Sequence, residues 1–379
     1  MKVSRRCTGV VAAFGLIAAW AAVGVPAGAT ARASTTPTTR ALLYLRSQQG
    51  ASGAIAGPSG SYADSELYAI GAAAGGYDPK SLAASSGNSV MDYLAAGAAK
   101  ACTTSNPGGC GELIQAVVAA GDAPQSFGGE DLLTTLSAAY DPTTGEYGDG
   151  EAFTQALAIQ GLAAAGAQVP PSAVQFLVAT QDGDGGWDYE DVANDPKAAT
   201  DFDTSDTNST SMVLMALDAA GDHTRDASAL AWLATQQDAD GGFPYQSGDG
   251  SDPDSTALVV QAIIATGADP SGAAWSKGDR TPLDLLVSTQ DKDGGYTFPG
   301  KSGPDAFTTS QVPPALEGVA FPVPFASRRW YEPGAALSAN ATAGTSGGSP
   351  PAALIYALVA LAAVLVIGGG GLAVVRTRR

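Results

Sequence analysis

The chain has 379 residues, of which 45% are hydrophobic and 15% charged, and its formal net charge is −18. A protein this acidic repels the phosphates of nucleic acid, so we expect no nucleic-acid partner. One histidine and three cysteines supply few ligands for a zinc site, which needs about four, so we expect neither a metal nor another cofactor.

The first 33 residues have the pattern of a secretory signal peptide. Lys2, Arg5 and Arg6 precede an uncharged apolar run over 10–25, and small-residue cleavage positions follow at Ala29, Ala31 and Ala33. All 37 acidic residues but only 12 basic ones lie between residues 34 and 351, which gives this part a net charge of −25. The sequence therefore predicts an acidic, exported domain.

Internal repeats organise residues 40–322. Three segments share a bulky residue, a leucine, a glutamine, Asp-x-Asp-Gly-Gly and an aromatic residue: 176–187, 232–243 and 285–296. A fourth copy begins at Tyr44 and has Ile55 in the aromatic position. We interpret the paired aspartates as turn formers, because calcium prefers six to eight oxygen ligands and each copy offers two carboxylates.

Each repeat contains two predicted helices. The first helix is amphipathic and ends at the glutamine: 40–49, 87–99, 130–139, 171–181, 227–237 and 281–290. The second is apolar on nearly every face and ends near Ala-Gly or Thr-Gly: 65–75, 111–121, 152–166, 208–220, 254–267 and 308–319. Helices that are apolar all round must be buried. With no capping repeats visible, we predict an all-α fold in which six buried helices lie inside six amphipathic ones, a closed six-repeat α/α toroid (α6/α6 barrel).

The two cysteines that remain after signal removal, Cys102 and Cys110, enclose a short turn-rich segment. An even pair at this spacing in an oxidising compartment predicts a disulfide.

The C-terminal region predicts a tether. Residues 331–351 are rich in Gly, Ser, Ala and Pro and are expected to form a flexible stalk. Residues 352–375 carry no charge and are long enough to cross a bilayer, and the arginines of the 376–379 tail place that end in the cytoplasm. We therefore expect a single-pass cell-membrane protein with an extracellular toroid.

The repeat Leu-x-x-x-Gln-Asp-x-Asp-Gly-Gly-Trp resembles the Gln-Trp repeat of squalene–hopene cyclases and of the prenyltransferase/squalene-oxidase (terpenoid cyclase) superfamily. The resemblance covers roughly 40–320 and is strongest over 171–300, while the second repeat and the glutamine position of the third depart from it. The superfamily includes class II terpene cyclases, protein prenyltransferase subunits, thioester domains and corrinoid carriers such as intrinsic factor. The resemblance thus implies the fold and leaves the activity open.

The catalytic signatures that the resemblance implies are incomplete here. Class II cyclases use Asp-x-Asp-Asp, whereas 201–204 and 252–255 both lack the last aspartate. Residues 109–113 resemble the Gly-Cys-Gly-Glu-Gln thioester motif, but Leu113 stands where the acyl partner glutamine is required. We therefore expect a binding module rather than an enzyme, with a glycan-active hydrolase or a degenerate terpene-cyclase-like enzyme as the alternative.

The ligand is expected at the mouth of the toroid formed by the N-termini of the buried helices, where acidic residues gather. A small molecule (a corrinoid by analogy) or a surface glycan or protein could bind there, with a second extracellular protein as a possible partner. The candidate ligand-binding residues are Asp64, Glu151, Asp206, Asn208, Asp252 and Asp254. We expect the repeat aromatics Trp187, Phe243 and Tyr296 to pack under the turns instead.

Overall fold

The computed structural model describes residues 36–55, 62–83, 87–148, 150–189 and 205–325. The predicted signal peptide, stalk, membrane span and cytoplasmic tail lie outside these residues, as do Asp201 and Asp203. No helix in the described ranges is long and apolar enough to span a membrane.

Twelve α-helices account for most of the described chain. They are α1 (Pro37–Ser47), α2 (Ala63–Ala74), α3 (Val90–Ala101), α4 (Pro107–Ala119), α5 (Leu132–Ala138), α6 (Ala152–Ala164), α7 (Pro171–Ala179), α8 (Thr207–Ala220), α9 (Asp226–Gln236), α10 (Pro253–Ala265), α11 (Pro282–Ser288) and α12 (Ala306–Leu316). Two 3-10 turns, η1 (Pro79–Ser81) and η2 (Ala273–Trp275), and a short antiparallel pair, β1 (Tyr140–Asp141) and β2 (Glu146–Tyr147), lie in the connections. The mostly helical architecture confirms the predicted fold class.

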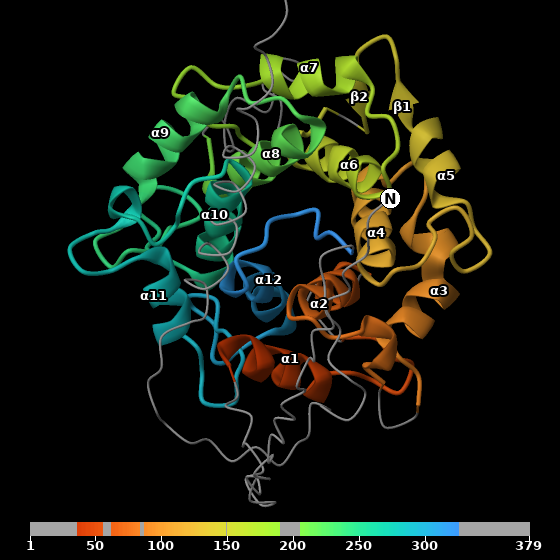
Figure 1. Cartoon of the computed structure of the whole chain (residues 1–379), viewed down its shortest axis with the longest axis horizontal. Helices are drawn as coiled ribbons and strands as arrows, with labels where there is room; N and C mark the ends of the chain where they lie inside the picture. The colour runs from red at the N-terminus through yellow and green to blue at the C-terminus, as the bar shows by residue number, and fades with distance from the viewer. Residues whose placement is uncertain (1–35, 56–61, 84–86, 149, 190–204, 326–379) are drawn as a thin grey trace, which may run out of the picture. The chain divides into compact units, whose positions relative to one another are not determined.

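The even-numbered helices form an inner ring in Figure 1, and the odd-numbered helices surround it. Each inner helix contacts the next inner helix along the chain, and α12 contacts α2, so the ring is closed. The inner helices are buried on nearly all sides, as their apolar sequences require. The prediction of an inner apolar helix and an outer amphipathic helix in every repeat is therefore confirmed.

Hydrogen bonds at the seam join the first repeat to the last. The Gln290 side chain donates to the Pro37 carbonyl at 2.8 Å, and Arg40 donates to the Asp291 carbonyl at 2.9 Å. The hydroxyl of Tyr44 donates to the Pro304 carbonyl at 2.7 Å. These bonds satisfy groups that an open array of repeats would leave to solvent.

The glutamine of the repeat ties neighbouring repeats together. Gln237 donates to the Gly241 carbonyl of its own turn at 2.9 Å and to the Trp275 carbonyl of the next repeat at 2.8 Å. In the third repeat, which lacks this glutamine, Gln155 of α6 donates instead to the carbonyls of Gly145 and Ala173, at 2.9 and 3.0 Å. The link between neighbouring repeats is thus made here by a side-chain amide of the inner helix.

The Asp-x-Asp-Gly-Gly segments form tight turns. The Asp240 carboxylate accepts from the backbone of Gly242 at 3.1 Å and from the hydroxyl of Ser251 at 2.8 Å. Gly241 has φ of +90°, a conformation that side chains with a Cβ rarely adopt. The aspartates therefore form turns, as predicted. The repeat aromatics Trp187, Phe243 and Tyr296 are fully buried.

The predicted disulfide is present. Cys102 caps the C-terminus of α3 and is bonded to Cys110 in α4, with the two Cα atoms 3.9 Å apart. The bridge joins an outer helix to the inner helix of the same repeat. Because the Cys110 sulfur is bonded to Cys102, it is not free for thioester chemistry.

Candidate functional site: acidic helix starts and a filled ring

Acidic side chains lie at or near the start of every inner helix, in two settings. Asp206, Asp252 and Asp305 are N-caps, and their carboxylates accept from the backbone of Ser209, Ser255 and Thr308 at 2.7, 2.7 and 2.9 Å. Such bonds satisfy N–H groups that the helix leaves unpaired. Asp64, Glu112 and Asp254 lie inside the first two turns instead, where no capping role explains them.

Glu66 of α2 and Glu112 of α4 form a hydrogen-bonded carboxyl pair. Burial raises the pKa of Glu66 well above its usual range, and the neighbouring Glu112 raises it further. Burial also raises the pKa of Glu112, to about 7, with the hydrogen bond from Glu66 acting against it and Asp64 adding to it. Two neighbouring carboxylates would repel each other, so both are not ionised together. Glu66 is therefore the protonated partner, and its O–H donates the hydrogen bond to the Glu112 carboxylate.

Asp252 and Asp254 of α10 lie close to Asp305 of α12. Asp254 is 5% exposed, and its Oδ1 has no hydrogen-bond partner among the described residues. Burial raises the pKa of Asp254 well above its usual range, and the charges of Asp252 and Asp305 raise it further. A pocket of about 390 Å³ opens beside this group and is lined by Asp254, Phe298, Lys301, Ser302, Gly303, Asp305, Phe307 and Thr308.

The remaining predicted residues occupy other parts of the mouth. Burial raises the pKa of Asp206 to about 6, and hydrogen bonds from Ser209, Asn208 and Tyr245 act in the opposite direction. Glu151, the N-cap of α6, accepts from Thr154 at 2.7 Å and from the hydroxyl of Tyr189 at 3.4 Å.

The structure thus brings Asp252 and Asp254 together with Asp305, and Asp64 together with Glu112. Sequence reasoning missed Glu66, Glu112 and Asp305 as site residues. A second acidic residue in the first turn of a largely apolar helix, as Glu66 is beside Asp64 in α2, was the signal that could have identified the pair.

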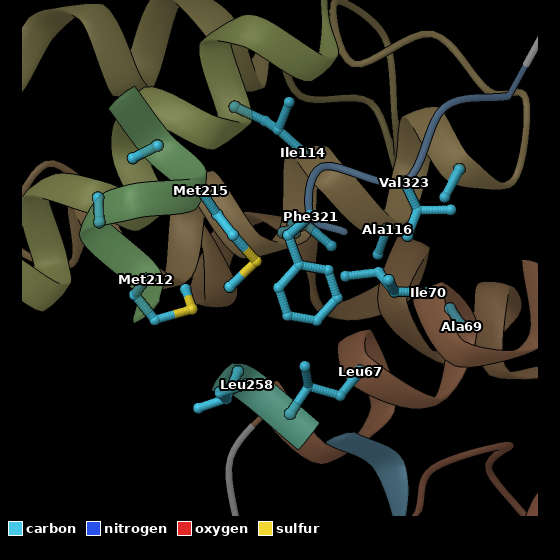
Figure 2. Packing of buried hydrophobic residues seen from close by; sticks show 14 of the residues in the cluster. Leu67, Ala69, Ile70, Ile114, Ala116, Met212, Met215, Leu258, Phe321 and Val323 are labelled. Atoms are coloured by element: carbon cyan, nitrogen blue, oxygen red, sulfur yellow. The ribbon is translucent and has the colours of Figure 1, made fainter. Parts of the chain in front are cut away.

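The segment that follows α12 crosses the ring in Figure 1. Phe321 and Val323 from this segment are 5% and 2% exposed. Figure 2 shows the Phe321 ring among side chains from four inner helices. The cluster that the view shows with Phe321 includes Leu67, Ile70, Ile114, Ala116, Met212, Met215 and Leu258. The chain's own side chains thus occupy the part of the ring that Figure 2 shows.

Comparisons with known proteins identify the scaffold. No protein-family model matches the sequence. A drimenyl diphosphate synthase from Streptantibioticus cattleyicolor is 41% identical over 87 residues, which is 23% of this chain and only 15% of that synthase.

Among solved structures, the type II terpene cyclase MstE from Scytonema is similar with a TM-score of 0.53 and 14% identity, over 74% of this chain and 96% of the cyclase. A variant of MstE that holds its substrate, geranylgeranyl dihydroxybenzoate, is similar with a TM-score of 0.53 and 13% identity over the same shares of the two chains. The described chain therefore has the α-toroid fold of the terpenoid cyclase superfamily.

Proposed function

We propose that this chain is a non-catalytic binding module on a terpenoid-cyclase-like toroid, with its ligand at the mouth formed by the inner-helix N-termini. The observation that carries the proposal is the entry of the chain's own side chains into the ring. Phe321 and Val323 pack into the ring interior, where a cyclase of this fold would need space for an isoprenoid. A pocket lies beside Asp254, near the N-terminus of α10.

The chemistry of the acids supports the same conclusion. In the Asp252-Pro-Asp254-Ser255 segment, Asp252 is committed to capping α10, and no third aspartate follows to tune Asp254 as a strong acid. The side chains labelled with Phe321 in Figure 2 are aliphatic or methionine, which offer a carbocation little of the stabilisation that aromatic faces give.

A pocket of this size suits a compact ligand. A corrinoid is too large to enter such a pocket and would have to lie across the mouth, with a second extracellular protein covering its other face.

The cellular setting is part of the proposal. The signal peptide directs export, and 352–375 anchors the toroid at the outer surface of the cell membrane. Protease treatment of intact cells should release an acidic fragment that contains the toroid. Protection of the toroid in intact cells would contradict this topology.

The test of the binding function uses the full-length protein, with geranylgeranyl diphosphate as the candidate cyclase substrate and a panel of small molecules and glycans as ligands. We expect no turnover of the diphosphate and saturable binding of a panel member. Phe321→Ala should lower the unfolding free energy by about 3–5 kcal/mol, the usual cost of emptying a core aromatic position. Turnover of the diphosphate by the unmodified protein would overturn the proposal.

One observation favours a hydrolase as the second candidate. A carboxyl group whose pKa is raised to about 6, as that of Asp206 is, can act as a general acid near neutral pH. Hydrolysis of a polysaccharide that is lost in Asp206→Asn or Glu151→Gln would favour this function. The Glu66–Glu112 pair does not fit that role, because its carboxyls are hydrogen-bonded, closer than the roughly 5 Å or more between glycosidase acids.

A further inference from the structure

The pocket beside Asp254 is built from two adjacent inner helices and the loop between α11 and α12. Asp254 comes from the first turn of α10 and forms one wall. Asp305 and Thr308, at the start of α12, form another, and loop residues 298–303 complete it. The cavity volume of about 390 Å³ falls within the range of small-molecule sites.

Asp254 is the feature of this pocket that calls for a ligand. Its side chain is 5% exposed, yet its Oδ1 accepts no hydrogen bond from the described residues. The neighbouring carboxylates of Asp252 and Asp305 are already bonded to the backbone of Ser255 and Thr308. A buried carboxyl with an oxygen that lacks a hydrogen-bond partner is costly to the fold, so a complementary charge in the pocket would relieve part of that cost.

The remaining walls limit what that group can be. Phe298 and Phe307 line the pocket and offer apolar and aromatic surface. Two carboxyls, Asp254 and Asp305, line the pocket together with one lysine, Lys301, which is exposed, and the charge of Asp252 also acts on Asp254. An anion is therefore disfavoured. No group of three or more His, Cys, Asp or Glu residues within the described ranges is arranged to hold a metal ion.

We propose that this pocket binds a small organic ammonium ion, with the ammonium group against the Asp254 carboxylate and its apolar body against Phe298 and Phe307. The inference rests on the proposed binding function and names its ligand class. The ammonium group supplies a positive charge and hydrogen-bond donors to the Asp254 carboxyl, and aromatic faces attract cations within about 6 Å. Lys301 at the rim favours a ligand whose far end is neutral or anionic.

Binding should be linked to the release of a proton. In the free protein, burial and the charges of Asp252 and Asp305 raise the pKa of Asp254, so this carboxyl keeps its proton to higher pH than an exposed aspartate does. The ammonium ion binds the ionised carboxylate. Its affinity should therefore rise with pH over the range in which Asp254 titrates, for as long as the amine stays protonated.

The test measures binding of benzylamine, and of its neutral analogue benzyl alcohol, to the full-length protein by isothermal titration calorimetry. Benzylamine should bind at one site, at least about tenfold more tightly than benzyl alcohol, and Asp254→Asn should remove at least about tenfold of that affinity, as expected for a buried charged hydrogen bond. Calorimetry in two buffers of different ionisation enthalpy should show the proton release.

Asp279→Asn is the matched control, because it removes an exposed acid from the loop before α11 and leaves the pocket unchanged. Equal affinity for benzylamine and benzyl alcohol, or unchanged affinity in Asp254→Asn, would overturn the ammonium site. If Asp254→Asn instead weakens a neutral or anionic member of the ligand panel, the ligand class is wrong and the binding function stands. If no panel member and neither probe binds, both proposals fail.

Discussion

The replacement Asp206→Asn should make the protein more stable at neutral pH although it removes a helix cap of the native sequence. Asp206 caps α8 by accepting from the Ser209 backbone at 2.7 Å. Asparagine caps helices about as well as aspartate, because its side-chain oxygen accepts the same bond. The substitution therefore keeps the cap and removes the buried charge.

The magnitude follows from the pKa of Asp206, which burial raises from 3.8 to about 6 in the folded protein. A raised carboxyl pKa means that the folded state holds the proton more tightly than the unfolded chain. The stability that this proton gives is complete below pH 4 and is lost as pH rises through about 6. A shift of roughly two units corresponds to about 3 kcal/mol, so the variant should gain up to that amount over the unmodified protein between pH 4 and pH 8.

The assay is urea unfolding of both proteins between pH 4 and pH 8. Asp131→Asn is the matched control, because Asp131 caps α5 at an exposed position and its hydrogen bonds to Thr134 lower its pKa. The change in unfolding free energy should then have the opposite sign. The ionised Asp131 stabilises the fold at pH values above its unfolded pKa, so Asp131→Asn should lower the stability at those pH values. If the unfolding free energies of Asp206→Asn and of the unmodified protein change with pH in parallel, the reasoning is refuted.

Two further predictions concern the packing of the inner ring. In Gly161→Ala, the new Cβ would lie 2.6 Å from the Gly111 Cα, where α4 and α6 cross. The melting temperature should therefore fall, although alanine favours helix by about 1 kcal/mol, and an unchanged or higher value would show that the two helices can separate freely. Replacing Cys102 and Cys110 together with serine should cost about 2–3 kcal/mol in urea unfolding, because the bridge closes a short loop. In the unmodified protein, intact mass should rise by two hydrogens on reduction, and an unchanged mass would contradict the bridge.

The repeat pattern was sufficient to predict the helices and their layers. A helix that is apolar on every face has to be buried, and Gly after its last turn ends it, so inner helices such as α8 and α10 could be assigned from residue type alone. The third repeat shows where such reasoning ends. Its missing glutamine appeared as a defect in the sequence, but Gln155 supplies the same bonds from another helix. A substitution of this kind depends on two segments meeting in space and leaves no local pattern.

The sequence by itself determined which residues form helices, which helices are buried, that two cysteines pair, and that acids gather at inner-helix starts. Tertiary structure decided which of those acids act together. Glu66 meets Glu112, and Asp254 meets Asp305, because consecutive inner helices pack side by side in the ring. It also placed Phe321 inside the ring, since an apolar side chain after the last helix is buried wherever the closed ring leaves apolar space. Periodicity is a property of one segment, whereas a pKa shift or a filled interior depends on several segments at once.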